Sequence, residues 1–296
     1  METRKRKDFK LGSRLLVLLF MMGVGLIITS IIFLLTDNGH MLTLLTLQDV
    51  LVFILPAVVT MALFYYRPLH VMGFDKAPDW MSLAIIVLFY IISLPGMNWL
   101  VNINEAMTLP SWMSGIEQWM RASEDEAAAA TQGLLDIHTF GQLLVSLFVI
   151  AFMAGLSEEA LFRGAMLRTM QDSRLGTHAV VWITAIAFSA IHMQFYGFVP
   201  RLVLGLWLGY LFVWTGSLWV PIIAHTLNNS AVVLFSYLAN VGVVPEDYGD
   251  NLGLPVDGGF PYLAIISIIA SIAIAIYFHH NHNEASVHRS TNNKTF

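Results

Sequence analysis

The chain has 296 residues, of which 57% are hydrophobic and only 12% are charged; its formal net charge is −5 and it contains no cysteine. Soluble proteins have about a quarter of their residues charged, so this composition and a mean hydropathy of +0.69 exclude an ordinary soluble enzyme. The absence of cysteine excludes disulfides, Cys-ligated zinc and thiol nucleophiles. The acidic balance argues against a nucleic-acid partner. A polytopic membrane protein, with the lipid bilayer as its surroundings, fits all of these observations.

The apolar segments of the chain come in lengths that suit membrane helices. A helix needs roughly 20 apolar residues to cross the hydrocarbon core. Eight segments meet or approach this length, with the fourth interrupted by charge and the sixth short: 15–35, 50–66, 81–101, 140–167, 179–198, 202–215, 218–238 and 261–278. We therefore expect an all-α, polytopic transmembrane helix bundle of about eight spans.

The distribution of Lys and Arg predicts how this bundle is oriented. Basic residues collect on the cytoplasmic side of membrane proteins. With the N-terminus inside, only Arg121 and Arg201 of the 15 Lys and Arg residues fall on the outer side. We therefore expect both termini to be cytoplasmic. The lack of an organelle signal and the short loops favour a bacterial plasma membrane.

One predicted outer loop, 102–139, is long and acidic. Its stretches 107–113 and 116–130 could lie in the membrane interface as amphipathic helices, with Trp112 and Trp119 as anchors. A solvated acidic loop is the alternative interpretation, and the sequence is consistent with both.

Two carboxylates and two imidazoles lie inside the predicted spans, where they are unexpected. Glu158 and Glu159 are in the fourth span, His192 is in the fifth and His225 is in the seventh. A charged group at the bilayer centre costs on the order of 2.5–3.5 kcal/mol, so such groups are candidate functional residues. The sequence thus predicts a site built from helices 4, 5 and 7.

Helical spacing assigns different surroundings to the two glutamates. Glu159 and Arg163 are four residues apart, which predicts an ion pair on one helix face. Glu158 is rotated by about 100°, lacks that partner and is free to act as a general base in a cavity. It lies level with His192 in an antiparallel hairpin, because both are 17 residues from Leu175. The alternative is that both glutamates are structural.

Some of the polar residues of the seventh predicted span lie on one helix face. His225 and Asn229 are four residues apart, so their side chains project together, whereas Asn228 points elsewhere and could hold helices together. The alternative for His225 and Asn229 is likewise hydrogen bonding between helices. A single membrane histidine such as His192 is also often a packing residue.

Three motifs follow one another on these predicted helices. They are Glu158-Glu159-Ala-Leu-Phe-Arg163, Phe188-Ser-Ala-Ile-His192 and His225-Thr-Leu-Asn-Asn229. In this order they resemble the CPBP intramembrane proteases, a family that includes type II CAAX prenyl endopeptidases and bacterial bacteriocin-processing or immunity (Abi) proteins. The resemblance covers about residues 151–233.

The resemblance implies that the protein is an enzyme that hydrolyses a peptide bond of a membrane-associated protein or peptide. Transferred by motif position, Glu158 is the base that activates water, and His192 helps to hold that water. Glu159 and Arg163 support the site.

The resemblance assigns His225 and Asn229 to stabilisation of the oxyanion, which contributes strongly to acyl-transfer catalysis. The family is also described as metalloproteases, and Glu158, His192 and His225 could serve as ligands of a divalent metal such as zinc, with one position left open. The same residues satisfy both mechanisms.

The resemblance also divides the chain. Residues 1–138 supply N-terminal membrane helices and the acidic outer loop, 139–240 form the catalytic core, and 241–296 supply an outer loop, the last helix and a cytoplasmic tail. Two other functions use the same residues: a transporter or proton relay, and a non-catalytic immunity or scaffold protein. No H-E-x-x-H, G-x-G-D or G-x-S-G motif of other intramembrane protease classes occurs.

Overall fold

The computed structural model describes residues 9–36, 41–255 and 259–292, and the regular elements of this part are all helices. The predicted all-α class is therefore confirmed. The basic residues 4–7, which contribute to the predicted orientation, lie outside the described residues. The elements of the first half are α1 (Leu11–Leu35), α2 (Met41–Gln48), η2 (Asp49–Ile54), α3 (Leu55–Phe64), α4 (Pro68–Met72), α5 (Trp80–Glu105), η3 (Ser111–Met113) and α6 (Ser114–Leu134).

The second half contains the elements that hold the three motifs. Its first membrane helix is continuous from residue 140 to residue 171, with two π-helical stretches inside it. The elements are α7 (Phe140–Ser146), η4 (Leu147–Met153), α8 (Ala154–Glu159), η5 (Ala160–Leu167), α9 (Arg168–Gln171), α10 (Thr177–Ala190), α11 (Phe198–Thr215), α12 (Trp219–Asn240), α13 (Tyr248–Asn251) and α14 (Tyr262–Asn292).

The number of membrane-spanning helices differs from the expectation of about eight. In the described part of the chain, seven helices are long and apolar enough to cross a membrane. The predicted fifth span, 179–198, corresponds to α10, which has 14 residues and hence a length of about 21 Å. The hydrocarbon core is about 30 Å thick. In this described part the bundle thus has seven long helices and one short apolar helix.

The short helix α10 ends before His192, which the sequence places inside a span. Met193 has a φ of +53°, a left-handed conformation that cannot continue an α-helix. The His192 ring bends back and donates from Nδ1 to the Phe188 carbonyl at 2.8 Å. That carbonyl belongs to the last turn of the helix, where backbone acceptors lack intrahelical partners. His192 therefore lies in a turn at the end of a helix.

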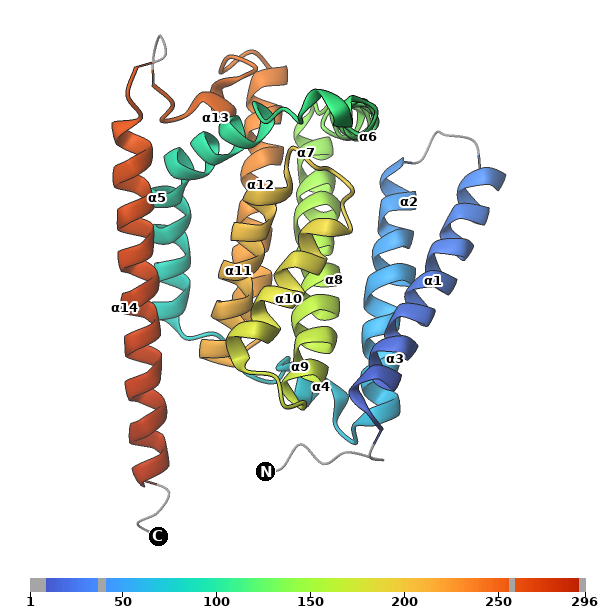
Figure 1. Cartoon of the computed structure of the whole chain (residues 1–296), viewed down its shortest axis with the longest axis vertical. Coiled ribbons are helices and arrows are strands. Elements are labelled where there is room, and N and C mark those ends of the chain that lie inside the picture. Colours follow the sequence, from blue (N-terminus) through green and yellow to red (C-terminus); the bar gives the residue numbers. More distant parts are fainter. Residues whose placement is uncertain (1–8, 37–40, 256–258, 293–296) are drawn as a thin grey trace.

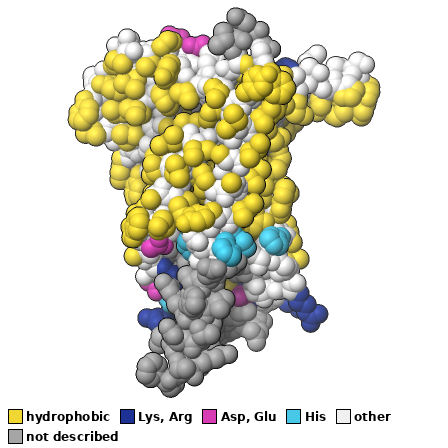
Figure 2. Space-filling view, turned by 90° about the vertical axis from the view of Figure 1, so that its left-hand side faces the viewer, with side chains coloured by type: hydrophobic (Ala, Val, Ile, Leu, Met, Phe, Trp, Pro, Cys, Tyr) yellow, Lys and Arg dark blue, Asp and Glu magenta, His cyan; other side chains and the backbone are white. Residues whose placement is uncertain are grey.

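The helices run alongside one another as a bundle. The start of the first helix and the end of the last helix lie at the same end of this bundle. Figure 1 shows that α1 begins and α14 ends at one end of the bundle, whereas α6 and α13 lie at the opposite end. Hydrophobic side chains cover most of the face that contains α14, and basic and His side chains gather below them (Figure 2). Large apolar residues are exposed on α1, such as Leu34 at 81%, as expected for contact with lipid.

The predicted acidic loop contains the long helix α6, which confirms the helical alternative for residues 116–130. This helix packs on the turn that follows His192. The Tyr196 amide donates to Glu124 at 3.1 Å, and the Arg121 guanidinium lies over the Tyr196 ring at 4.4 Å. We conclude that α6 holds the turn in place from outside the bundle.

Small residues bring α10 and α11 close together beside the first motif. A Cβ on Gly205 would lie 3.2 Å from Ala185, and one on Gly209 would lie 3.0 Å from Val181. Contacts between small residues are a common means of close helix approach in membranes. As a result, the backbone carbonyl of Gly205 faces the helix that contains the two glutamates.

Candidate active site

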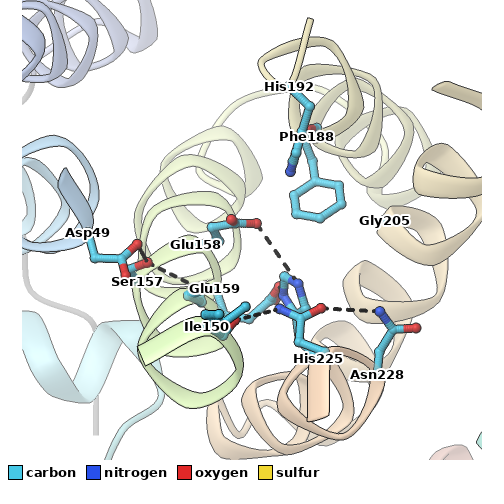
Figure 3. A network of polar contacts seen from close by, with 12 residues as sticks. Asp49, Ile150, Ser157, Glu158, Glu159, Phe188, His192, Gly205, His225 and Asn228 are labelled. Atoms are coloured by element: carbon cyan, nitrogen blue, oxygen red, sulfur yellow. Dashed lines mark hydrogen bonds and ion pairs between the residues drawn. The ribbon is translucent and has the colours of Figure 1, made fainter. Parts of the chain in front are cut away.

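The motif residues come from four neighbouring elements of the bundle. Glu158 and Glu159 end α8, Arg163 lies in η5, His225 lies on α12, and His192 follows α10. Figure 3 shows Glu158, His192 and His225 pointing into the same space between these elements. The structure therefore brings together residues that are up to 67 positions apart, from 158 to 225.

The ion pair predicted from the spacing of the first motif is confirmed. Arg163 Nη1 lies 2.6 Å from Glu159 Oε1, and both side chains are 0% exposed. Arg163 Nη2 also donates to the Gly205 carbonyl at 2.8 Å. The guanidinium lies over the Phe188 ring, 4.8 Å from its centroid. Arg163 thus joins the glutamate helix to α11 and to the end of α10.

The same carboxylate orients the His225 ring. His225 Nδ1 lies 3.0 Å from Glu159 Oε1. Because a carboxylate paired with a guanidinium accepts hydrogen bonds, the ring donates from Nδ1. Its other nitrogen, Nε2, is directed toward Glu158, at 4.0 Å from Oε2. Glu159 therefore fixes which nitrogen of His225 faces the first glutamate.

The His192 ring is oriented in an equivalent way by a backbone group. Its Nδ1 donates to the Phe188 carbonyl, which leaves Nε2 available as an acceptor in the neutral ring. The Phe188 ring lies edge-on to both imidazoles, with centroids 5.3 Å from His192 and 5.7 Å from His225. Phe188 therefore packs against both imidazole rings.

Glu158 has the features that the spacing predicts for an unpaired carboxylate. Its side chain is 15% exposed, and its Oε2 is buried without a hydrogen-bond partner. The 4.0 Å separation from His225 Nε2 is too long for a direct hydrogen bond, and polar groups at such distances are commonly bridged by water. Glu158 can therefore receive a proton from a molecule held in the space that it shares with His192 and His225.

The two asparagines of the third motif are linked to each other and to a neighbouring helix. Asn229 makes the contact between helices that is its alternative interpretation, donating to the Ile150 carbonyl of η4 at 3.4 Å. Asn228 donates to Asn229 Oδ1 at 3.2 Å. The oxyanion role of Asn229 stays a prediction.

A third buried carboxylate lies next to the site and was missed by the sequence analysis. Asp49 is 3% exposed and accepts a hydrogen bond of 2.8 Å from Ser157, the residue before Glu158. The predicted second span began at residue 50, whereas the helix runs from Met41 to Phe64. The apolar residues 41–47 were the signal that could have placed Asp49 inside the membrane.

A cavity lies against the site on the far side of α12. It has a volume of about 750 Å³, and its walls come from α5, α11, α12 and α14. Apolar residues such as Trp207 make up most of the lining, and the charged and polar residues include Arg201, Asn228, Glu246 and Asp250. Because Asn228 belongs to the third motif and donates to Asn229, the cavity reaches the edge of the site.

The predicted metal ligands do not form a ready metal site. The donor types of Glu158, His192 and His225 suit zinc, and each ring donates from Nδ1 to an oxygen acceptor, as metal-bound histidines do. However, within the described residues no group of three His, Cys, Asp or Glu side chains could hold a metal ion.

Comparisons with known proteins agree with the motifs. Residues 140–231 match the family model of the type II CAAX prenyl endopeptidase Rce1-like proteins. The chain is also 30% identical, over 80 residues, to the uncharacterized protein YpbD of Bacillus subtilis; the aligned part covers 26% of this chain and 38% of that protein. No solved structure matches the chain. Residues 140–231, which contain all three motifs, are therefore similar to the Rce1-like type II CAAX prenyl endopeptidases.

Proposed function

We propose that the protein is an intramembrane endopeptidase that hydrolyses a peptide bond of a membrane-associated protein or peptide. The observation that supports this most directly is the unpartnered buried oxygen of Glu158, which faces the Nε2 atom of His225 at 4.0 Å. A carboxylate in this position can act as a general base. The family of residues 140–231 is consistent with protease activity.

The reaction starts with water placed between Glu158 and the Nε2 atom of His192. Glu158 takes one proton from this water while the water oxygen bonds to the carbonyl carbon of the substrate. The developing oxyanion requires a hydrogen-bond donor. His225 supplies one from Nε2 when its ring is protonated, a state that the neighbouring Glu159 carboxylate stabilises.

Collapse of the tetrahedral intermediate completes the reaction. The carbon–nitrogen bond breaks, and Glu158 returns its proton to the leaving amine. Glu159 and Arg163 contribute by orienting His225 and by holding the surrounding helices, because their contacts are with protein groups. No other reactant is needed, since one water molecule supplies the hydroxyl and the proton that the two products gain.

Cleavage with labelled water tests this function against its alternatives. The purified protein in liposomes is incubated with a library of membrane peptides in ¹⁸O-water, and products are analysed by mass spectrometry. We expect cleaved peptides with one ¹⁸O in the new carboxylate. If no peptide is cleaved and a solute moves with a proton gradient, the protein is a transporter; binding of a membrane protein alone would indicate a scaffold.

We further propose that the protein lies in a bacterial plasma membrane with the start of α1 and the end of α14 in the cytoplasm. This orientation is supported by the basic residues near those ends and by α6 at the opposite end (Figure 1). Reporter fusions at Glu124 in α6 and in the C-terminal tail should report opposite sides. Fusions that report the same side would contradict the orientation.

The role of zinc can be measured separately from peptide cleavage. If Glu158, His192 and His225 come together around zinc, detergent-purified protein should contain ~1 zinc per chain, and His192→Ala should lose it. The water mechanism proposed above instead predicts that activity persists after treatment with a chelator. Elemental analysis, together with activity before and after chelation, distinguishes the two.

A further inference from the structure

Arg201 is a partly buried cation that has only neutral hydrogen-bond acceptors as direct partners. It lies in the first turn of α11 and lines the 750 Å³ cavity. Its guanidinium donates to the Gln194 carbonyl at 3.2 Å and to the Gln194 side-chain oxygen, which are both neutral. Among the described residues, no carboxylate forms an ion pair with it. Glu124 and Glu158 act on this partly buried guanidinium from a distance. Neither carboxylate contacts it directly, and a charge in apolar surroundings is favoured by a direct partner.

The backbone around Arg201 holds this guanidinium in one place. A Cβ on Gly197 would lie 2.5 Å from Nη1 and 2.7 Å from Cζ of Arg201. The guanidinium thus lies directly against the backbone of Gly197, in space that any larger residue would occupy. Gln194 and Gly197 both belong to the turn that follows His192, so the turn that positions the imidazole also positions the guanidinium.

Arg201 is also close enough to the site to act on it electrostatically. The charge of Arg201 acts on His192, and the carboxylates of Glu124 and Glu158 act on Arg201. Arg201 also lines the cavity, whose wall includes Asn228. The guanidinium thus lies both near Glu158 and in the wall of the cavity. The fork of nitrogen donors in Arg binds planar carboxylates through paired hydrogen bonds.

We propose that Arg201 binds a carboxylate of the substrate and thereby selects which peptide bond is placed at Glu158. This inference rests on the proposed peptidase function. The carboxylate comes from the C-terminus of the substrate or from an Asp or Glu side chain, and both have the planar charged group that the guanidinium fits. The apolar walls of the cavity hold the adjoining part of the substrate.

Binding to an inactive variant tests this proposal without requiring cleavage. Glu158→Gln protein is titrated with a fluorescent, short apolar peptide in three forms: the free acid, the C-terminal amide, and the amide with one internal Asp. Charge-assisted hydrogen bonds are worth about 1.5–3 kcal/mol, so a carboxylate-bearing form should bind roughly 10–100-fold more tightly than the plain amide. The form that binds more tightly than the plain amide identifies the source of the carboxylate.

Substitutions at two positions then assign the effect to the guanidinium. Adding Arg201→Gln should reduce the affinity for the carboxylate-bearing form to about the affinity for the plain amide. Adding Gly197→Ala instead keeps the charge but displaces the guanidinium, so the preference should fall by a smaller factor. Arg201→Lys should restore part of the preference that Arg201→Gln loses, because it restores the charge without the paired donors. Thermal unfolding of each variant identifies any that does not fold.

The possible outcomes separate this proposal from the proposed function. If the three peptides bind equally well, or if Arg201→Gln weakens all three by the same factor, Arg201 has a structural role and the inference is wrong. If a carboxylate preference is found but no peptide is cleaved by the unsubstituted protein, the inference stands as a binding site and the peptidase function fails. Once a peptide that the protein cleaves is known, the preference for its carboxylate should appear mainly as a lower KM.

Discussion

Replacing Glu158 by Gln is expected to lower peptide hydrolysis by roughly 10²–10⁴-fold, the range for loss of a general base. The substitution keeps the size of the side chain and one oxygen, but the amide cannot take a proton from water. Because Glu158 Oε2 has no hydrogen-bond partner, the folded protein loses no contact at this atom. Expression and thermal stability should therefore change little. Initial rates on one cleaved peptide, with melting curves, provide the measurement.

Asp49 offers a matched control for this experiment. It is also a buried carboxylate, and it lies on the other side of Ser157. Asn at position 49 can still accept the Ser157 hydroxyl through its carbonyl oxygen, so Asp49→Asn should keep most of the activity. Equal losses in the two variants would show that buried negative charge in this region, rather than a base at Glu158, supports catalysis.

The features that the sequence predicted correctly depend on local rules. The helical class follows from the length of the apolar segments, and the pairing of Glu159 with Arg163 follows from their separation of four residues. The unpaired state of Glu158 follows from the same geometry. Each of these inferences needs only one helix, so no knowledge of the neighbouring helices was required.

The features that were missed depend on contacts between elements. No Gly or Pro marks the end of α10, whose termination is associated with the positive φ of Met193 and the ring of His192. The contact between Asp49 and Ser157 joins residues 108 positions apart, and no local pattern indicates it. The position of Asn229 against η4 likewise requires the packing of α12 to be known. The direction that a polar side chain faces in a helix bundle is set by the neighbouring helices.

Removing Arg163 should have the largest effect on stability of any substitution in the site. Arg163→Ala leaves the Glu159 carboxylate buried without its guanidinium partner, and breaking a buried ion pair in this way costs about 3–5 kcal/mol. It also leaves the Gly205 carbonyl without its donor. Protein yield and melting temperature should therefore fall together with activity, which distinguishes this variant from Glu158→Gln.

The partners of Arg163 separate the contribution of its charge from that of its geometry. Combining Arg163→Ala with Glu159→Gln should recover part of the lost stability, because neither buried charge then remains, but activity should stay low because His225 loses the carboxylate that orients it. Arg163→Lys keeps the charge, yet a single ammonium cannot reproduce the planar fork that reaches both Glu159 and Gly205, so its stability should fall between those of the unsubstituted protein and Arg163→Ala. Melting temperatures of the variants in one detergent test this order. If the double variant were as unstable as Arg163→Ala, the cost would come from the lost contact with α11 rather than from the stranded Glu159 carboxylate, and the ion pair would be secondary to helix packing.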